Sequence, residues 1–174
     1  MSDMTHDVLC ERAARWLLNT KRCRLVLREV VSGTCETPDA IGWRNGWSML
    51  IECKVSRSDF QRDAQKYFRQ ADGLHGMGSF RWYMTPPGLL RMSEVPEGWG
   101  LLEVHTRSVF EIHPAVQREL SPSAYRSELL HQMRGIRMVN GEDDYPVKKS
   151  AAYVDLTPPM EPTDSIAEHK AVAP

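Results

Sequence analysis

The chain has 174 residues, of which 41% are hydrophobic and 26% are charged, and its net charge at pH 7 is −1. These values are typical of one globular domain with a buried core. No run approaches the ~20 apolar residues of a membrane span, and we expect no secretory signal because the first residues lack an apolar stretch after a basic start. The four cysteines form no CxxC pair, so neither a zinc site nor a disulfide framework is indicated. We expect reduced thiols in a cytoplasmic protein.

Charge and proline content divide the chain at residue 140. Residues 140–174 hold seven acidic residues, three lysines and five of the eleven prolines, whereas residues 1–139 hold 19 basic and 16 acidic residues, a net charge of +3. A segment with few large apolar groups cannot offset the entropy lost on ordering. We therefore predict a folded domain over residues 1–139 and a mostly disordered acidic tail over 140–174. The mildly basic domain allows a polyanionic partner, and the tail is a candidate for binding a partner protein.

Hydrophobic periodicity and turn signals predict the elements of the domain. The expected segments are a helix over 5–19 capped by Thr5, a strand over 25–31, two β-runs around Asn45-Gly46, a helix of about 14 residues that Ser58 opens as a capping box, strands over 80–85, 100–104 and 108–113, and a helix over 124–138. The resulting order, α-β-β-β-α-β followed by further elements, predicts a mixed α/β sandwich.

The hairpin around Asn45-Gly46 has a register that brings charged residues together. If these two residues form the turn, Arg44 faces Trp47, and Asp39 lies opposite Glu52. Residues that face each other in an antiparallel pair share one side of the sheet, with Cβ atoms ~4.5–5.5 Å apart. Lys54 shares this side because strand side chains alternate, and the opposite side belongs to Ile51, Cys53 and Val55.

Two carboxylates and an ammonium at one end of a hairpin suggest metal chemistry. At ~5 Å the carboxylates of Asp39 and Glu52 repel each other by roughly 3 kcal/mol at an effective dielectric constant near 20. A divalent cation such as Mg²⁺ or Mn²⁺ would remove this repulsion, because both ions prefer carboxylate and water oxygens. Lys54 could then neutralise charge that develops in a transition state. The alternative is structural: Lys54 neutralises both acids on a solvated face of the sheet.

The same residues resemble a nuclease signature. Pro38-Asp39, twelve intervening residues and Glu52-Cys53-Lys54 resemble the motif of the PD-(D/E)XK nuclease superfamily. The segments that resemble its MmcB-like branch, which is associated with DNA repair, are ECKVSRSDFQRD, WYMTPPGLL and VPEGWGLLEV. The resemblance covers roughly residues 5–115. It implies a restriction-endonuclease-like αβββαβ core, with a mixed central sheet flanked by helices. It also implies metal-dependent hydrolysis of DNA phosphodiesters, in repair or in phage or mobile-element DNA processing.

The resemblance also implies roles for individual residues. Asp39 and Glu52 would bind Mg²⁺ or Mn²⁺ together with the backbone carbonyl of Cys53, and Lys54 would be the catalytic lysine. Many members add an acid from the first helix, and Glu11 is the candidate here, although an ordinary i,i+4 surface pair with Arg15 is the stronger explanation of this residue. The QxxxY motif that some branches carry in the following helix is absent.

Basic residues after the lysine are candidates for contacting DNA phosphates. They are Arg57, Arg62, Lys66 and Arg69. The alternative is a solvated helix face on which these residues alternate with Asp59 and Asp63. Small nucleases of this kind often act as dimers, so a homodimer is also expected, although no segment identifies an interface. The rival to the enzyme is a nuclease-like fold that binds DNA or a protein without cutting.

Overall fold

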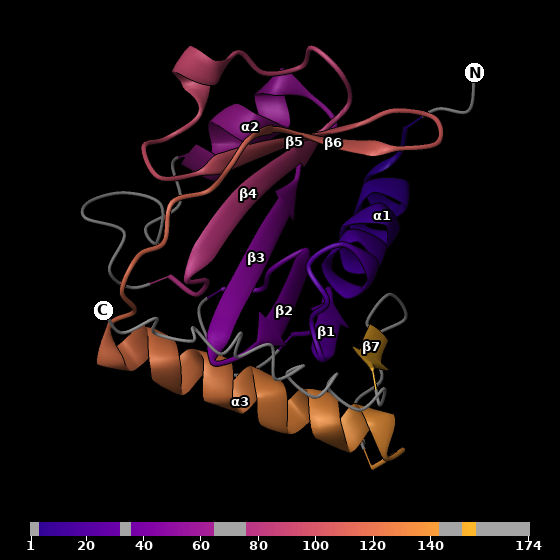
Figure 1. The fold of residues 1–174 in the computed structure, drawn as a ribbon, viewed down its shortest axis with the longest axis vertical. Helices are drawn as coiled ribbons and strands as arrows, with labels where there is room; N and C mark the ends of the chain where they lie inside the picture. The colour runs from indigo at the N-terminus through magenta and orange to yellow at the C-terminus, as the bar shows by residue number, and fades with distance from the viewer. Residues whose placement is uncertain (1–3, 32–35, 65–75, 143–150, 156–174) are drawn as a thin grey trace, which may run out of the picture.

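A computed structural model describes residues 4–31, 36–64, 76–142 and 151–155. These residues form a seven-stranded sheet with the strand order β6-β5-β4-β3-β2-β1-β7 (Figure 1). Its strands are β1 (Leu25–Arg28), β2 (Ala40–Arg44), β3 (Trp47–Cys53), β4 (Phe80–Thr85), β5 (Gly100–Val104), β6 (Val109–His113) and β7 (Ala151–Val154). The sheet is mixed, because β4 runs parallel to β3 and β5 while the other neighbours are antiparallel. The predicted α/β class is confirmed.

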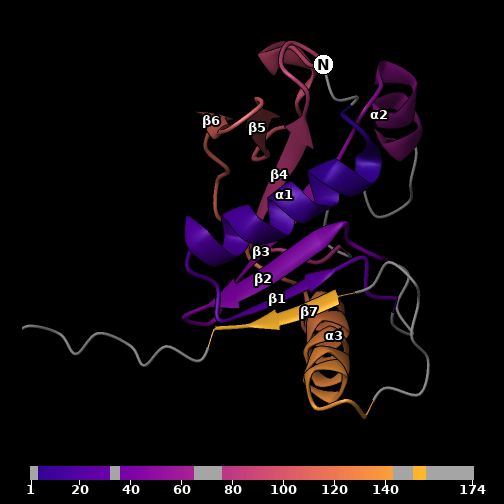
Figure 2. The same cartoon turned by 90° about the vertical axis from the view of Figure 1, so that its right-hand side faces the viewer.

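Helices cover both faces of this sheet. They are α1 (His6–Asn19), α2 (Arg57–Ala64) and α3 (Pro122–Val139), and a short 3₁₀ turn spans Met92–Glu94. Figure 2 shows α1 running across one side of the sheet, with α3 near the edge formed by β1 and β7. Two buried clusters result. One joins α1 to one face of the sheet, and the partly buried Phe60 of α2 and Met138 of α3 pack against the other, on the opposite face.

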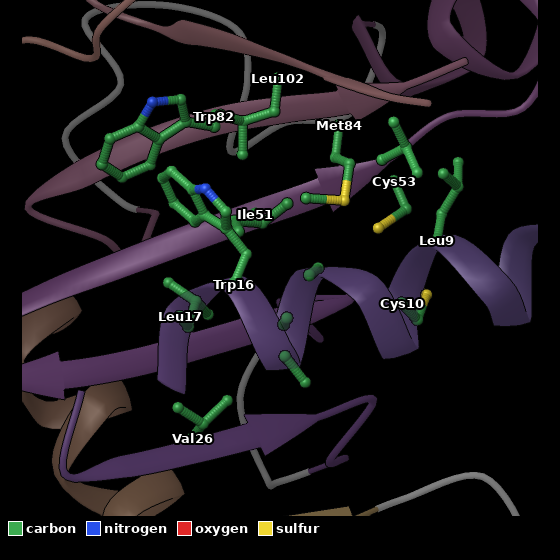
Figure 3. Packing of buried hydrophobic residues seen from close by; sticks show 14 of the residues in the cluster. Leu9, Cys10, Trp16, Leu17, Val26, Ile51, Cys53, Trp82, Met84 and Leu102 are labelled. Carbon is green, nitrogen blue, oxygen red and sulfur yellow. The ribbon is translucent and has the colours of Figure 1, made fainter. Parts of the chain in front are cut away.

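Helix α1 forms because its apolar residues recur at helical spacing and its start is capped. The hydroxyl of Thr5 accepts a hydrogen bond from the backbone N–H of Val8 at 3.4 Å, as predicted for the N-cap. Its apolar side packs against the central strands (Figure 3), where the rings of Trp16 and Trp82 meet edge to face at 5.5 Å between centroids. This packing fixes the first turn of α1 over the end of the β2–β3 hairpin.

The hairpin has the predicted register. Ala40 pairs with Ile51, and the ladder continues pair by pair to Arg44 and Trp47. The two turn residues have φ of +51° at Asn45 and +81° at Gly46, the left-handed conformations that a type I′ turn requires at both positions. The register therefore places Asp39 and Glu52 at the same end of the hairpin.

Three predicted boundaries are wrong in detail. Strand β1 ends at Arg28 rather than at residue 31, because Glu29 adopts a left-handed φ of +49° that interrupts the ladder. Helix α2 begins at Arg57, and its first turn is capped by the hydroxyl of Ser56, which accepts from the N–H of Asp59 at 3.2 Å, rather than by Ser58. Helix α3 begins two residues before the predicted start, at Pro122. The predicted continuation of α2 beyond Ala64 falls outside the described residues.

The acidic segment contributes to the sheet. Strand β7 pairs with β1, and the hydroxyl of Tyr153 donates to the carboxylate of Glu11 at 3.3 Å. Residues 151–154 therefore have regular structure within the segment that we predict to be mostly disordered. Residues 143–150 and 156–174 lie outside the described part of the chain. Among the described helices, none combines the length and the apolar character that a membrane crossing needs.

Candidate active site

The centre of the candidate site is formed by Glu52 and Lys54 at the end of β3. Their side chains lie on the same side of the strand, as predicted, and the Nζ of Lys54 is 3.3 Å from the Oε2 of Glu52. The backbone N–H of Lys54 donates to the carbonyl of Met84, which anchors the segment to β4. Only 3% of the Glu52 side chain and 5% of the Lys54 side chain are exposed. The pair is therefore inside the fold rather than on a solvated face.

A third charged residue, Asp63, completes this cluster from α2. Its Oδ1 is 3.4 Å from the Nζ of Lys54, and its Oδ2 accepts a hydrogen bond from the hydroxyl of Tyr83 at 3.0 Å. Asp63 is almost completely buried, so the interpretation of this residue as part of a solvated helix face is wrong. The sequence did contain a signal for the burial of Asp63. This residue lies three positions after Phe60, whose ring packs edge-on against Tyr83, and residues at this spacing are neighbours on a helix.

The charge on Lys54 is stabilised by its surroundings. Burial by itself lowers the pKa of Lys54, but the attraction of Glu52, Asp63 and Asp39 outweighs this effect and raises the pKa above its ordinary value of 10.5. Lys54 is thus an ammonium at neutral pH. It cannot accept a proton from water, but it can neutralise negative charge on a phosphate.

Asp39 immediately precedes β2 and contacts α1. Its Oδ2 accepts a hydrogen bond from the N–H of Cys53 at 2.7 Å, and its Oδ1 lies 3.3 Å from the Nε2 of His6. The electrostatic effect of Asp39 extends to Lys54, yet its direct partners are the Cys53 amide and the imidazole of His6. These contacts, with the Cys10 thiol nearby, raise the pKa of His6 to about 11, chiefly through the hydrogen bond with Asp39.

Sequence reasoning missed the part that α1 plays at this end of the hairpin. His6 and Cys10 are four residues apart on α1, and both face Asp39. The Sγ of Cys10 lies 3.5 Å from the Nδ1 of His6. The i,i+4 spacing of an imidazole and a thiol was a usable signal, because such residues share one helix face. Their convergence on Asp39 required the tertiary structure.

Glu11, the predicted acid from the first helix, has basic partners. It forms ion pairs with Arg28 and with Arg15, the latter at 2.9 Å, and it accepts from the hydroxyl of Tyr153. The predicted i,i+4 pair with Arg15 is therefore confirmed. Glu11 is absent from the groups of potential metal-ligating side chains found among the described residues, which centre on His6.

The basic residues proposed to bind phosphates have mixed positions. Arg57 donates to the carbonyl of Leu89 at 3.0 Å and to the carboxylate of Glu94, so it ties the start of α2 to the segment after β4. Arg62 is largely exposed and lies 3.8 Å from Asp59, one helical turn away. Lys66 and Arg69 lie outside the described residues.

Comparison with known proteins bears on the fold. No family model and no curated protein matches the sequence. The structure is similar to that of the SPO1766 protein of unknown function from Silicibacter pomeroyi, with a TM-score of 0.54 and 20% sequence identity. The match covers 83% of this chain and 99% of that one. At this identity the similarity shows a shared fold and carries no activity from one protein to the other.

Proposed function

We propose that the protein is a metal-dependent deoxyribonuclease that hydrolyses DNA phosphodiester bonds. The observation that carries the proposal is the buried contact between Glu52 and Lys54, 3.3 Å apart, at the end of the hairpin that Asp39 also adjoins. The αβββαβ order of the elements supports the same activity. DNA repair, or the processing of phage or mobile-element DNA, is the proposed setting.

The donor atoms at this end of the hairpin suit a small, hard cation. Asp39, Glu52 and the backbone carbonyl of Cys53 offer only oxygen, the element that Mg²⁺ and Mn²⁺ prefer. Three carboxylates, those of Asp39, Glu52 and Asp63, adjoin this end of the hairpin, and Lys54 contacts two of them. Such a concentration of carboxylates would attract a divalent cation.

Each residue then has a defined task. When bound, the divalent ion would supply Lewis-acid activation of the phosphate and lower the pKa of a bound water. Asp39 and Glu52 would hold the ion, and the hydrogen bond from the Cys53 amide keeps the Asp39 carboxylate in one orientation. Lys54, held as an ammonium by Glu52 and Asp63, would neutralise charge on the phosphate in the transition state.

The proposal is tested by nicking of supercoiled plasmid DNA with the full chain in Mg²⁺ or Mn²⁺. We expect metal-dependent nicking by the wild type and a loss of about 100-fold or more in Asp39→Asn, Glu52→Gln and Lys54→Met. The matched control is Glu119→Gln, which alters an exposed carboxylate outside the site and should nick at the wild-type rate. Circular dichroism checks that each variant folds. Wild-type turnover in all three site variants would overturn the assignment.

The burial of Lys54 favours a second candidate function. The short helix α2 covers this lysine, and Asp63 neutralises it without any ligand. The charge of Lys54 is thus balanced inside the protein. A nuclease-like fold that binds DNA or a protein without cutting would retain such a balanced arrangement. Metal-independent DNA binding by the wild type, measured by gel shift together with an absence of nicking in both metals, would support this second function over the first.

A further inference from the structure

We propose that His6, Cys10 and Asp39 form a binding site for a transition-metal ion of the Zn²⁺ class. This site differs from the oxygen-lined position proposed for Mg²⁺, although the two share Asp39. The inference goes beyond the nuclease activity and does not depend on it, because its test reads metal binding directly. The spacing of the cysteines along the sequence did not indicate such a site, since two of its three ligands are not cysteines.

The imidazole of His6 lies at separations from the other two ligand atoms that are close to those of a tetrahedral ion. The Nε2 of His6 lies 3.3 Å from the Oδ1 of Asp39 and 3.8 Å from the Sγ of Cys10. Zinc bonds of ~2.0–2.1 Å to nitrogen and oxygen and ~2.3 Å to sulfur give tetrahedral edges of about 3.3 Å and 3.6 Å. One ligand atom from each residue lies within 4.8 Å of the other two. The two printed separations lie within a few tenths of an ångström of these edges, and Asp39 and Cys10 would close on each other around an ion.

Neighbouring groups lie beside two of these ligands. The Oε1 of Glu29 is 4.0 Å from the Nδ1 of His6, so a carboxylate is near the ring nitrogen that does not contact Asp39. Metal-binding histidines commonly donate their second N–H to a carboxylate, which fixes the tautomer and the ring orientation. The amide of Cys53 does the same for Asp39, because it donates to Oδ2 and leaves Oδ1 facing His6.

The donor types select the kind of ion. A nitrogen, a thiolate sulfur and a carboxylate oxygen suit Zn²⁺ and Co²⁺, whereas Mg²⁺ binds oxygen almost exclusively. Three protein ligands leave a fourth position for water, as in catalytic zinc sites. The thiol of Cys53 is buried on β3 on the side that faces Cys10 of α1 (Figure 3). The competing explanation is that His6 serves only as an ion-pair partner for Asp39.

The test is a titration of the reduced, metal-free full chain with Co²⁺, followed by absorption spectroscopy. We expect a sulfur-to-cobalt charge-transfer band and the visible bands of a tetrahedral ion, and displacement of both by Zn²⁺. Cys10→Ser should remove the charge-transfer band, and His6→Gln should weaken binding about 10-fold or more. The control is Cys23→Ser, which alters another fully buried thiol whose Sγ lies 3.9 Å from the Sδ of Met49, and it should leave the spectrum unchanged.

Several outcomes would overturn the site. The wild type would show no cobalt bands, or the bands would survive in Cys10→Ser, or they would disappear in Cys53→Ser while Cys10→Ser retains them. Circular dichroism of each variant separates loss of the site from loss of the fold. Plasmid nicking in Mg²⁺ is recorded on the same samples. Cobalt bands without nicking support this site and count against the nuclease, whereas nicking without cobalt bands does the reverse.

Discussion

The carboxylate of Asp63 lies 3.4 Å from the ammonium of Lys54, and both side chains are almost fully buried. The contact joins α2 to the segment that follows β3. It means that the candidate catalytic lysine is also part of the structural core on this face of the sheet. The stability of the fold and the chemistry of the site therefore depend on one shared group.

Removing Asp63 should destabilise the protein strongly. Asp63→Ala leaves the buried Lys54 with one carboxylate fewer, and breaking a buried ion pair from one side costs ~3–5 kcal/mol of the free energy of unfolding. Urea denaturation measures this change. Asp59→Ala is the control, because its ion pair with Arg62 is exposed and is worth less than about 1 kcal/mol. Equal effects of the two substitutions would contradict the buried pair.

The free energy of unfolding should depend on His6 in a defined pH range. The pKa of His6 is raised from 6.5 to about 11, chiefly by its hydrogen bond with Asp39, so the folded state retains this proton more strongly than the unfolded state. The stabilisation is therefore complete below about pH 6.5 and is lost as the pH rises toward about 11. Because the ring is partly exposed, we expect a contribution of only about 1 kcal/mol.

The measurement for His6 is urea denaturation of the metal-free protein at about pH 6, 8 and 10, for the wild type and for His6→Gln. The difference between the two proteins isolates the histidine from other groups that titrate. It should shrink steadily as the pH rises. A difference that stays constant or grows over this range would contradict the ion pair with Asp39.

Glu128 should be important for attaching α3 to the sheet. Its buried carboxylate accepts hydrogen bonds from the hydroxyl of Ser48 at 2.7 Å, the N–H of Gly78 at 2.8 Å and the indole of Trp43 at 3.1 Å. Glu128→Ala leaves three buried donors without this acceptor and should lower the free energy of unfolding by about 3 kcal/mol. Glu119→Ala, at an exposed position just before α3, should change it by less than about 0.5 kcal/mol.

Truncation after Glu142 tests the role of β7. The shortened chain loses the pairing of β7 with β1 and the hydrogen bond from Tyr153 to Glu11. We expect a loss of at least about 1 kcal/mol in the free energy of unfolding. Tyr153→Phe, which removes only the hydroxyl, should lose less than the truncation. A truncated protein as stable as the full chain would show that β7 contributes nothing to the fold.

The hairpin could be predicted from sequence because its information is local. Asn45-Gly46 determines the turn, the turn determines the register, and the alternation of side chains then places Glu52 and Lys54 on one side. Each step uses residues that are close together in the chain. The register was therefore correct pair by pair, and so was the order of the elements that surround it.

The partners of the site could not be derived in the same way. Asp63 lies beside the apolar stripe of α2. Burial of its carboxylate is favourable only because Lys54 and Tyr83 contact it, and those two residues come from other segments of the chain. The contact between His6 and Asp39 likewise depends on how α1 packs across the sheet. A sequence pattern shows which face a residue occupies, but not which residue from a distant segment will meet it.

The pairing of β7 with β1 also affects the order in which the protein can fold. Strand β1 consists of residues 25–28, and β7, which pairs with its outer edge, consists of residues 151–154. The two strands can therefore pair only after almost the whole domain has been synthesised. Contacts between such distant segments form slowly, because the entropy of loop closure must be overcome first. Until then the outer edge of β1 exposes unpaired backbone groups, which can recruit strands from other chains. The nascent protein should thus be most prone to aggregation just before β7 emerges.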